Sequence, residues 1–331
     1  MALMTGRTRS GGRIAAAHQG PVWPLAMTCE PSGRSLIASA SHDGMSLWDA
    51  TTGSRVMHRP SVGSARRLWL DSSDGKDQLL AVAEEDDIRV HVAETGKQVR
   101  ALTGGGGFWS VASAPGPDGH RLWVAGGHDG RVHRWIQATG ESYGDPLTGH
   151  TDSVKAVAAT PLADGTVAMV SGGDDQMIRR WDAARGVSLG EPLAGHAGSV
   201  VAAALIADVG RSPIILAGDT TGALSRWDFG TGEQIGSPIR AHEGGIIDVC
   251  VLGTGRGATV ITTGYDQVVR RWHGLTGDLL DDGLRGASAA TGVVGVNPAL
   301  VVGGLDGGIT LLTFDRTGGS GRVSTEQMES R

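Results

Sequence analysis

Tryptophan recurs in this chain at a nearly fixed interval. Four of the nine tryptophans are spaced 46, 46 and 45 residues apart: Trp135, Trp181, Trp227 and Trp272. The same register, extended in both directions, reaches Trp48, His91 and Leu312. Each position follows a turn rich in Gly or Ser and lies in a short run of alternating polar and apolar residues. A period near 45 residues with this pattern is typical of propeller blades of about four strands each. We therefore expect seven such units.

The residues around this register resemble the WD (tryptophan–aspartate) repeat family of β-propellers, across about residues 11–316. Besides the Trp, that family carries a Gly-His pair upstream, a Ser or Thr in the second strand and an Asp in the following turn. The resemblance implies structural roles for such residues in repeats one, four, five and six: His18, Ser39, Asp43, Trp48, His150, Ser171, Asp175, Trp181, His196, Trp227, His242, Thr262, Asp266 and Trp272. Repeat five departs from the pattern, with Ala217 and Thr221 at its Ser and Asp positions. The degenerate repeats two, three and seven retain the following pairs: Asp86 and His91, Asp129 and Trp135, Asp306 and Leu312.

Buried indole rings explain why polar residues accompany the tryptophans. Burying a Trp removes about 150–250 Å² from water, but its N–H then needs an acceptor, or the unsatisfied donor costs about 1–3 kcal/mol. The resemblance implies that the hydroxyl, imidazole and carboxylate of each repeat form a relay that satisfies this donor. The same residue types also occur in hydrolytic Ser-His-Asp sites. Because they recur several times in one chain, we favour the structural interpretation.

The pattern predicts an all-β chain folded as a seven-bladed β-propeller of four-stranded antiparallel blades. A strand-like segment, 13–17, precedes the first repeat, and the last repeat ends on a third-strand pattern, 307–314. We therefore expect the N-terminal strand to complete the last blade and close the ring. The predicted organisation has three parts: a flexible N-terminus (1–10), the propeller (11–316) and a disordered tail (317–331).

Composition argues against several classes of partner. The net charge is −6 with an isoelectric point near 6.0, so no overall positive field favours nucleic acid. The longest apolar run, 200–207, is too short to span a membrane, and the N-terminus lacks the apolar stretch of a secretory signal. Cys29 and Cys250 form no pattern of paired spacings. We expect a cytoplasmic monomer, and the excess of Arg over Lys is typical of a GC-rich bacterial genome.

Motifs that carry chemistry are not found in the sequence. There is no phosphate-binding GxxxxGK[ST] loop, no GxSxG nucleophile elbow and no HExxH zinc helix. His128 and His133 lie five residues apart without further ligands at metal-binding spacing. The acidic cluster 84–87 is interpreted as a solvated turn, or alternatively as a patch for a basic partner. We therefore predict no catalytic, cofactor-binding or metal-binding residues.

Residues outside the repeat register are the candidates for function. In the family, one position near the start of the first strand and one before the turn Asp commonly point to a docking face. These positions and one neighbouring aromatic predict the following partner-binding residues: Trp23, His42, Phe108, Trp109, His128, Lys155, Asp174 and Tyr265. Aromatic residues are enriched at interface hot spots. Trp69 and Trp123 lie within strand-like runs, and we expect them in the core.

The resemblance implies a non-enzymatic scaffold that binds a protein or peptide on one face of the ring. Two alternatives remain open. One is a propeller enzyme of hydrolase or lyase type with a site at the central channel, which would need a polar cluster outside the repeat pattern. The other is a stand-alone sensor module of a bacterial signalling system. Fold alone does not decide among them.

Overall fold

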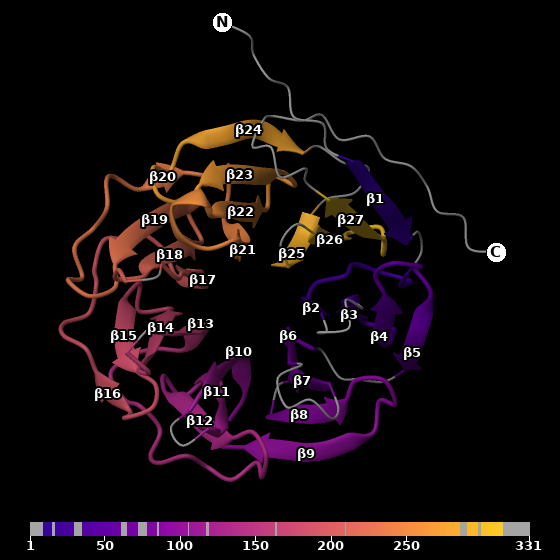
Figure 1. The fold of residues 1–331 in the computed structure, drawn as a ribbon, viewed down its shortest axis with the longest axis horizontal. Coiled ribbons are helices and arrows are strands. Elements are labelled where there is room, and N and C mark those ends of the chain that lie inside the picture. Colours follow the sequence, from indigo (N-terminus) through magenta and orange to yellow (C-terminus); the bar gives the residue numbers. More distant parts are fainter. Residues whose placement is uncertain are drawn as a thin grey trace, which may run out of the picture.

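A ring of antiparallel sheets surrounds a central axis in the computed structural model (Figure 1). The structure describes residues 9–14, 17–29, 35–60, 65–71, 78–84, 86–104, 106–116, 119–162, 164–208, 210–284, 290–296 and 299–313. Within them the strands form seven sheets, and each sheet is a blade. The innermost strands contact one another in a cycle, in the order β2, β6, β10, β13, β17, β21 and β25, and β25 in turn contacts β2. The predicted all-β propeller of antiparallel blades is confirmed.

Six of these sheets have four strands. Blade 1 contains β2 (Leu25–Cys29), β3 (Ser35–Ser41), β4 (Gly44–Asp49) and β5 (Arg55–Arg59), and blade 2 contains β6 (Arg67–Asp71), β7 (Leu79–Ala83), β8 (Asp87–Val92) and β9 (Gln98–Thr103). Blade 4 contains β13 (Val154–Pro161), β14 (Val167–Gly173), β15 (Ile178–Asp182) and β16 (Val187–Ser188), and blade 5 contains β17 (Val200–Ile206), β18 (Ile214–Asp219), β19 (Ala223–Asp228) and β20 (Ile239–Arg240). Blade 6 contains β21 (Ile246–Leu252), β22 (Thr259–Gly264), β23 (Val269–His273) and β24 (Leu279–Leu284), with a short 3₁₀ turn at Gly255–Gly257. Blade 7 contains β25 (Ala290–Val296), β26 (Ala299–Gly304), β27 (Ile309–Thr313) and β1 (Arg9–Ile14).

Blade 3 departs from the prediction of four strands in every blade. Its described strands are three: β10 (Phe108–Pro115), β11 (Arg121–Gly127) and β12 (Val132–Ile136). The segment after β12 meets its edge only at two isolated bridges, Trp135 with Ser142 and Val132 with Leu147. The prediction of four strands in all seven blades is therefore wrong for blade 3 and holds for the other six.

A Gly-x-Pro sequence explains why the outer strand fails there. Gly144 has a φ of 67°, a left-handed conformation that turns the chain out of the strand, and Pro146 has no N–H to donate to the ladder. The same triplet recurs at 190–192 and 236–238, and the fourth strands of blades 4 and 5 are only two residues long. The irregular outer edge therefore belongs to three successive blades.

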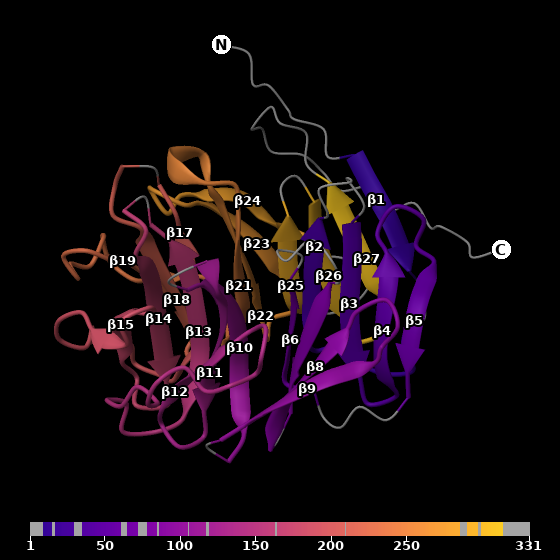
Figure 2. The ribbon, with the colours of Figure 1, turned by 60° about the horizontal axis from the view of Figure 1, so that its bottom comes forward.

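Apolar side chains fill the spaces between neighbouring blades. One buried cluster joins Leu122 and Val124 of blade 3 to Val157, Met169 and Trp181 of blade 4. Trp123 is fully buried on β11, opposite Trp135 in the ladder, as expected for a core residue. Figure 2 shows the blades standing side by side around the axis, and buried apolar clusters join blade 1 to blade 2 and blade 3 to blade 4.

Arginines join each blade to the next through backbone carbonyls. Arg134, Arg180 and Arg226 each precede the repeat Trp and donate to Ala183, Phe229 and Leu275 at 2.9, 2.7 and 2.6 Å, respectively. Each acceptor lies in the turn after the third strand of the following blade, 49 residues further along the chain. Arg59 and Arg100 make the corresponding bonds to Gly96 and Ala138 from the outer strands of blades 1 and 2. These arginines are structural, and each bridges two blades.

The N-terminal strand lies beside the last strand of the seventh blade. β1 spans Arg9–Ile14, earlier than the predicted 13–17, and pairs antiparallel with β27. β1 begins inside the segment 1–10 that was predicted to be flexible. Residues 1–8 and the predicted tail 317–331 lie outside the described residues. That β1 holds the ring closed stays a prediction.

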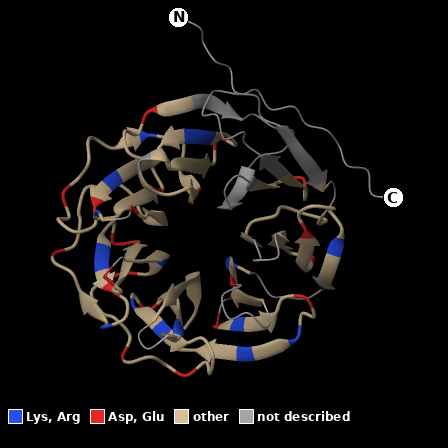
Figure 3. Ribbon diagram, in the orientation of Figure 1, with Lys and Arg blue, Asp and Glu red and all other residues tan. Residues whose placement is uncertain are grey.

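Among the described residues, no helix has the length and apolar character needed to cross a membrane. Charged residues of both signs are interspersed around the described part of the ring, without a sector of one sign (Figure 3).

Removal of β1 tests its role in closing the ring. Deleting residues 1–14 would leave the edge of β27 unpaired, and we expect the melting temperature of the chain to fall by several degrees. Deleting residues 1–8, which leaves β1 in place, is the matched control and should preserve the melting temperature. Equal melting temperatures for the two truncations would show that β1 does not hold the ring.

Candidate functional site

One face of the ring collects the polar residues of the repeat pattern. In each blade the first strand begins where the second ends, because the two are antiparallel: Val154 pairs with Gly173, and Ile246 pairs with Gly264. The turns that follow the second strands therefore lie beside the segments that enter the first strands. We call this side the relay face, defined by three His–Asp pairs: His18 and Asp43, His150 and Asp175, His242 and Asp266.

Blade 4 contains a complete hydrogen-bond relay. The Trp181 indole N–H donates to the Ser171 hydroxyl at 2.8 Å. That hydroxyl lies 2.8 Å from His150 Nε2, and His150 Nδ1 lies 2.9 Å from the Asp175 carboxylate. A neutral imidazole protonated at Nδ1 satisfies every member of this chain, since Nε2 then accepts the hydroxyl proton. The relay ties the second and third strands to the loop that enters the blade.

The relay recurs in blades 1 and 6. In blade 1 the Trp48 indole donates to Ser39 at 2.8 Å, and His18 contacts Ser39 at 2.8 Å and Asp43 at 2.6 Å. In blade 6 the contacts run from Trp272 to Thr262 at 2.9 Å, from Thr262 to His242 at 2.7 Å, and from His242 to Asp266 at 2.8 Å. Three blades therefore share one geometry.

Blade 5 lacks the hydroxyl and uses a different carboxylate. The repeat spacing placed Thr221 at the Asp position of this blade. His196 Nδ1 instead contacts Asp219, at 2.8 Å, so the carboxylate comes from a residue two positions earlier. Instead the Thr221 hydroxyl donates to Asp219 at 2.6 Å. Ala217 lies at the Ser position, and His196 Nε2 is buried without a hydrogen-bond partner among the described residues. The relay in this blade stops at the imidazole.

In blade 3 the histidine comes from the third strand and not from the loop that enters the blade. His133 on β12 contacts Asp129 at 3.0 Å and stacks on Trp135, with ring centroids 5.7 Å apart. It lies opposite Ala125 in the ladder. Ala125 has the position that Ser171 has in blade 4, where Arg179 lies opposite. Phe108 packs edge-on against both His133 and Trp135, at 5.4 Å. His133 therefore takes the place of the loop histidine beside Asp129 and Trp135, and the sequence pattern did not reveal it.

Blades 2 and 7 have no repeat Trp. His91, at the Trp position of blade 2, is buried, and its Nδ1 lies 3.0 Å from Arg59 and 3.2 Å from the Gly96 carbonyl. In blade 7 the Asp306 carboxylate accepts the Gly308 N–H at 3.0 Å, which shapes the turn. The side chain of Leu312 lies outside the described residues.

Burial keeps the relay histidines neutral. Desolvation lowers the pKa of His18, His150, His196 and His242, and the neighbouring carboxylates oppose that shift without overcoming it. A general base needs access to a substrate, but these imidazoles are buried and each contacts the Asp of its blade. Among the described residues, no cluster of three or more His, Cys, Asp or Glu could hold a metal ion. The relay side chains are bonded to one another within their own blades.

Trp109 lies between two cations on the relay face. Its ring is contacted by the Arg66 guanidinium at 4.0 Å and by Lys155 Nζ at 3.3 Å, measured to the ring centroid. These side chains come from blades 2 and 4, on either side of Trp109 in blade 3. Lys155 also forms an ion pair with Asp174 at 3.1 Å, and the His128 ring lies 5.0 Å from Trp109. Four predicted partner-binding residues therefore form one cluster, which Arg66 completes.

The other predicted partner-binding residues divide into exposed and buried ones. Trp23 is 47% exposed and Tyr265 is 65% exposed, and His42 is also exposed. Leu305, 39% exposed, lies on the blade between those of Tyr265 and Trp23. Phe108, in contrast, is fully buried against His133 and Trp135, so its assignment as a partner-binding residue is wrong. The ladder between β10 and β11 has a β-bulge between Phe108 and Ser110, so Trp109 is the extra residue that pairs with none on β11, whereas Phe108 pairs with Gly127.

The acidic cluster at the second blade is partly neutralised. Arg89 lies 3.4 Å from Glu84 and 3.3 Å from Asp87. Glu84 is buried, so the interpretation of the cluster as a solvated turn does not hold for this residue. Trp69 also differs from its prediction as a core residue: it is half-buried and lines a cavity in the central channel.

The fold is a β-propeller, and the hydrogen-bond relays of three of its blades resemble those of WD repeats. The family model described as WD domain, G-beta repeat, matches residues 142–182. This segment contains the Gly-His pair, the Asp and the Trp of blade 4, so the match includes the complete relay. No curated protein gives a significant match to the chain. The family match and the ring of blades together support a WD-repeat propeller.

The lowered histidine pKa values predict a loss of stability in mild acid. Between the folded-state pKa and the ordinary value of 6.5, the unfolded chain binds more protons than the folded chain. The free energy of unfolding should therefore fall as the pH drops below about 6.5. Protonation would also remove the acceptor that Nε2 offers to the hydroxyl. Urea unfolding at pH 7.5 and 5.5 measures the difference.

A matched pair of variants identifies the residues responsible. His196→Asn should reduce the pH dependence of the free energy of unfolding, whereas His120→Asn, at an exposed histidine, should leave it unchanged. Equal stability of the wild type at both pH values would contradict the assignment of neutral buried relays.

Proposed function

We propose that this chain is a cytoplasmic, bacterial WD-repeat propeller that acts as a non-enzymatic scaffold, and that a protein or peptide partner docks on the relay face. The observation that supports this most directly is the distribution of side chains that no blade needs for its fold. Trp23, His42 and Tyr265 are exposed on the same face. Trp and Tyr are enriched at the hot spots of protein interfaces.

The relay face has two regions of different chemistry. Tyr265, Leu305 and Trp23 lie on blades 6, 7 and 1 and form an apolar arc. The cluster of Arg66, Trp109 and Lys155 lies on blades 2, 3 and 4 and forms a charged arc. Each cation over the indole contributes about 0.5–1 kcal/mol at an exposed site, so Trp109 holds the cations in place. A partner that covers both arcs would bury apolar surface on one and find charged hydrogen-bond donors on the other.

An enzyme with a site at the channel is the second candidate, and it receives less support. The loop histidines His150, His196 and His242 are each paired with an Asp of their own blade. The cavity in the channel has predominantly apolar walls. General acid–base or nucleophilic chemistry needs a converging set of titratable groups, and the described lining supplies only Arg67 and Cys250.

Affinity capture from cells of the source organism tests the docking face. We expect a partner that the wild type retains to be lost or weakened at least about tenfold with Trp23→Ala or Tyr265→Ala, in line with the cost of removing an interface hot spot. Val187→Ala is the matched control: Val187 is 47% exposed, as Trp23 is, but lies on the outer strand β16. A partner retained equally by all variants would remove the relay face as the docking surface.

A further inference from the structure

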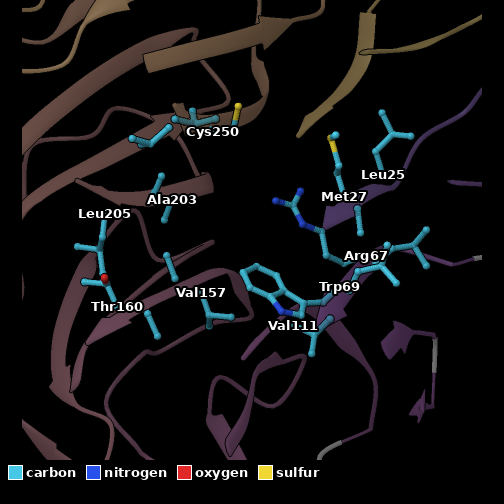
Figure 4. A pocket seen from close by; sticks show the side chains of 18 residues that line it. Leu25, Met27, Arg67, Trp69, Val111, Val157, Thr160, Ala203, Leu205 and Cys250 are labelled. Atoms are coloured by element: carbon cyan, nitrogen blue, oxygen red, sulfur yellow. The ribbon is translucent and has the colours of Figure 1, made fainter. Parts of the chain in front are cut away.

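The central channel contains a cavity of about 370 Å³ among the innermost strands of the described blades (Figure 4). Its walls come from β2, β6, β10, β13, β17 and β21. Leucine, valine, alanine and methionine make up most of the lining, and Trp69 and Arg67 are its largest members. At about 30 Å³ per water the space corresponds to on the order of ten water molecules, which is room for a small organic ligand.

Trp69 is the one large side chain among six residues at one level of the channel, those of β2, β6, β10, β13, β17 and β21. The equivalent positions of the five strands besides β6, fixed by their pairing with the second strands, are all small: Ala26, Ala112, Ala158, Ala204 and Cys250. Four of these five residues line the cavity together with Trp69. A half-buried indole that faces alanines leaves open space beside its ring instead of filling the channel. Such a geometry suits a flat ring that stacks on Trp69.

An ion pair crosses the channel next to this space. Arg67 Nη2 on β6 lies 3.0 Å from Asp248 Oδ1 on β21, and these two strands are not neighbours in the ring. Arg67 pairs with Ala83, and Asp248 pairs with Thr263. In its second strand, each of these partners directly follows the position that holds the relay hydroxyl in blade 6, Thr262. Arg67 and Asp248 therefore lie at one level, two residues nearer the relay face than Trp69. The ion pair spans the channel at that end of the cavity.

The pair also determines which polar group a ligand can carry. The Arg67 side chain is 34% exposed and lines the cavity, whereas the Asp248 side chain is only 7% exposed. A guanidinium carries five N–H donors, and the bond to Asp248 uses one nitrogen. Asp248 already neutralises the guanidinium, so a carboxylate would gain little net attraction to offset the cost of its desolvation, and a cation would be repelled by the exposed Arg67. An uncharged acceptor avoids both.

We propose that the central channel binds a small, uncharged aromatic molecule, which stacks on Trp69 and directs a hydroxyl or carbonyl oxygen at Arg67. Two residues of a strand span about 7 Å, so a fused two-ring molecule reaches from the indole to the guanidinium. This site is separate from the docking face and does not depend on the proposed scaffold function.

Titration calorimetry of the full chain with 2-naphthol tests the proposal, and 2-naphthoate has the same rings with a charged group. We expect 2-naphthol to bind with one site per chain and 2-naphthoate to bind at least about tenfold more weakly. Trp69→Ala should weaken binding of 2-naphthol about tenfold or more through the loss of stacking. Trp23→Ala, which removes an exposed tryptophan outside the channel, is the matched control and should bind as the wild type does.

A second variant keeps the test independent of the stability of Trp69→Ala. Ala204→Phe places a ring in the open space opposite Trp69, and it should abolish binding while the melting temperature is retained. Absence of 2-naphthol binding to the wild type, tighter binding of 2-naphthoate, or unchanged affinity in both channel variants would each overturn the proposal.

Discussion

The hydrogen bond from a buried indole N–H to a Ser or Thr hydroxyl is the interaction on which the blades depend. It allows a tryptophan to occupy the space between blades without an unsatisfied donor, and it occurs at 2.8–2.9 Å in blades 1, 4 and 6. The hydroxyl accepts this bond and donates its own proton to a neutral imidazole. The imidazole in turn is oriented by an Asp. A requirement of a single N–H group therefore fixes three further residues and the loop that carries them.

The remaining blades show how this requirement is met or avoided. Blade 3 replaces the loop histidine by His133 from its third strand, whereas blade 5 retains histidine and carboxylate but not the hydroxyl. Blade 2 has His91 in place of the tryptophan, held by Arg59 of the preceding blade. Variation within a blade is tolerable because the blades are also joined to one another. The arginines that donate to the next blade's turn carbonyls do this in regular and irregular blades alike.

Sequence reasoning predicted those features that local spacing encodes. The register of Trp48, Trp181 and Trp272 predicted the repeat unit and its relay. The short outer strands have a local cause as well, the Gly-x-Pro triplet at 144–146, which the sequence analysis did not use. In contrast, the role of His133 depends on which side chain faces Asp129 across a strand end, and Asp219 reaches His196 only after the turn has formed. These contacts are non-local and follow from packing rather than from spacing.

The same limit applies to the candidate sites. Phe108 and Trp109 are adjacent aromatics, and one is core while the other lies on the relay face, because a β-bulge takes Trp109 out of the ladder. Trp69 had the pattern of a core residue, but the ring of alanines around it appears only when six innermost strands are aligned in space. Relays within the blades thus provide stability, whereas residues outside the repeat pattern lie on the relay face and in the channel.

A double-mutant cycle on Trp181 and Ser171 tests the central claim most directly. Urea unfolding of Trp181→Phe, Ser171→Ala and the double variant gives the coupling energy between the two side chains. Because they share one buried hydrogen bond, we expect a coupling of about 0.5–3 kcal/mol, with the double variant less destabilised than the sum of the two single variants. The control cycle combines Ser171→Ala with Trp123→Phe, whose buried indole N–H has no partner among the described residues, and its coupling should be close to zero. Additive effects of Trp181→Phe and Ser171→Ala would show that the indole bond does not hold the blade together.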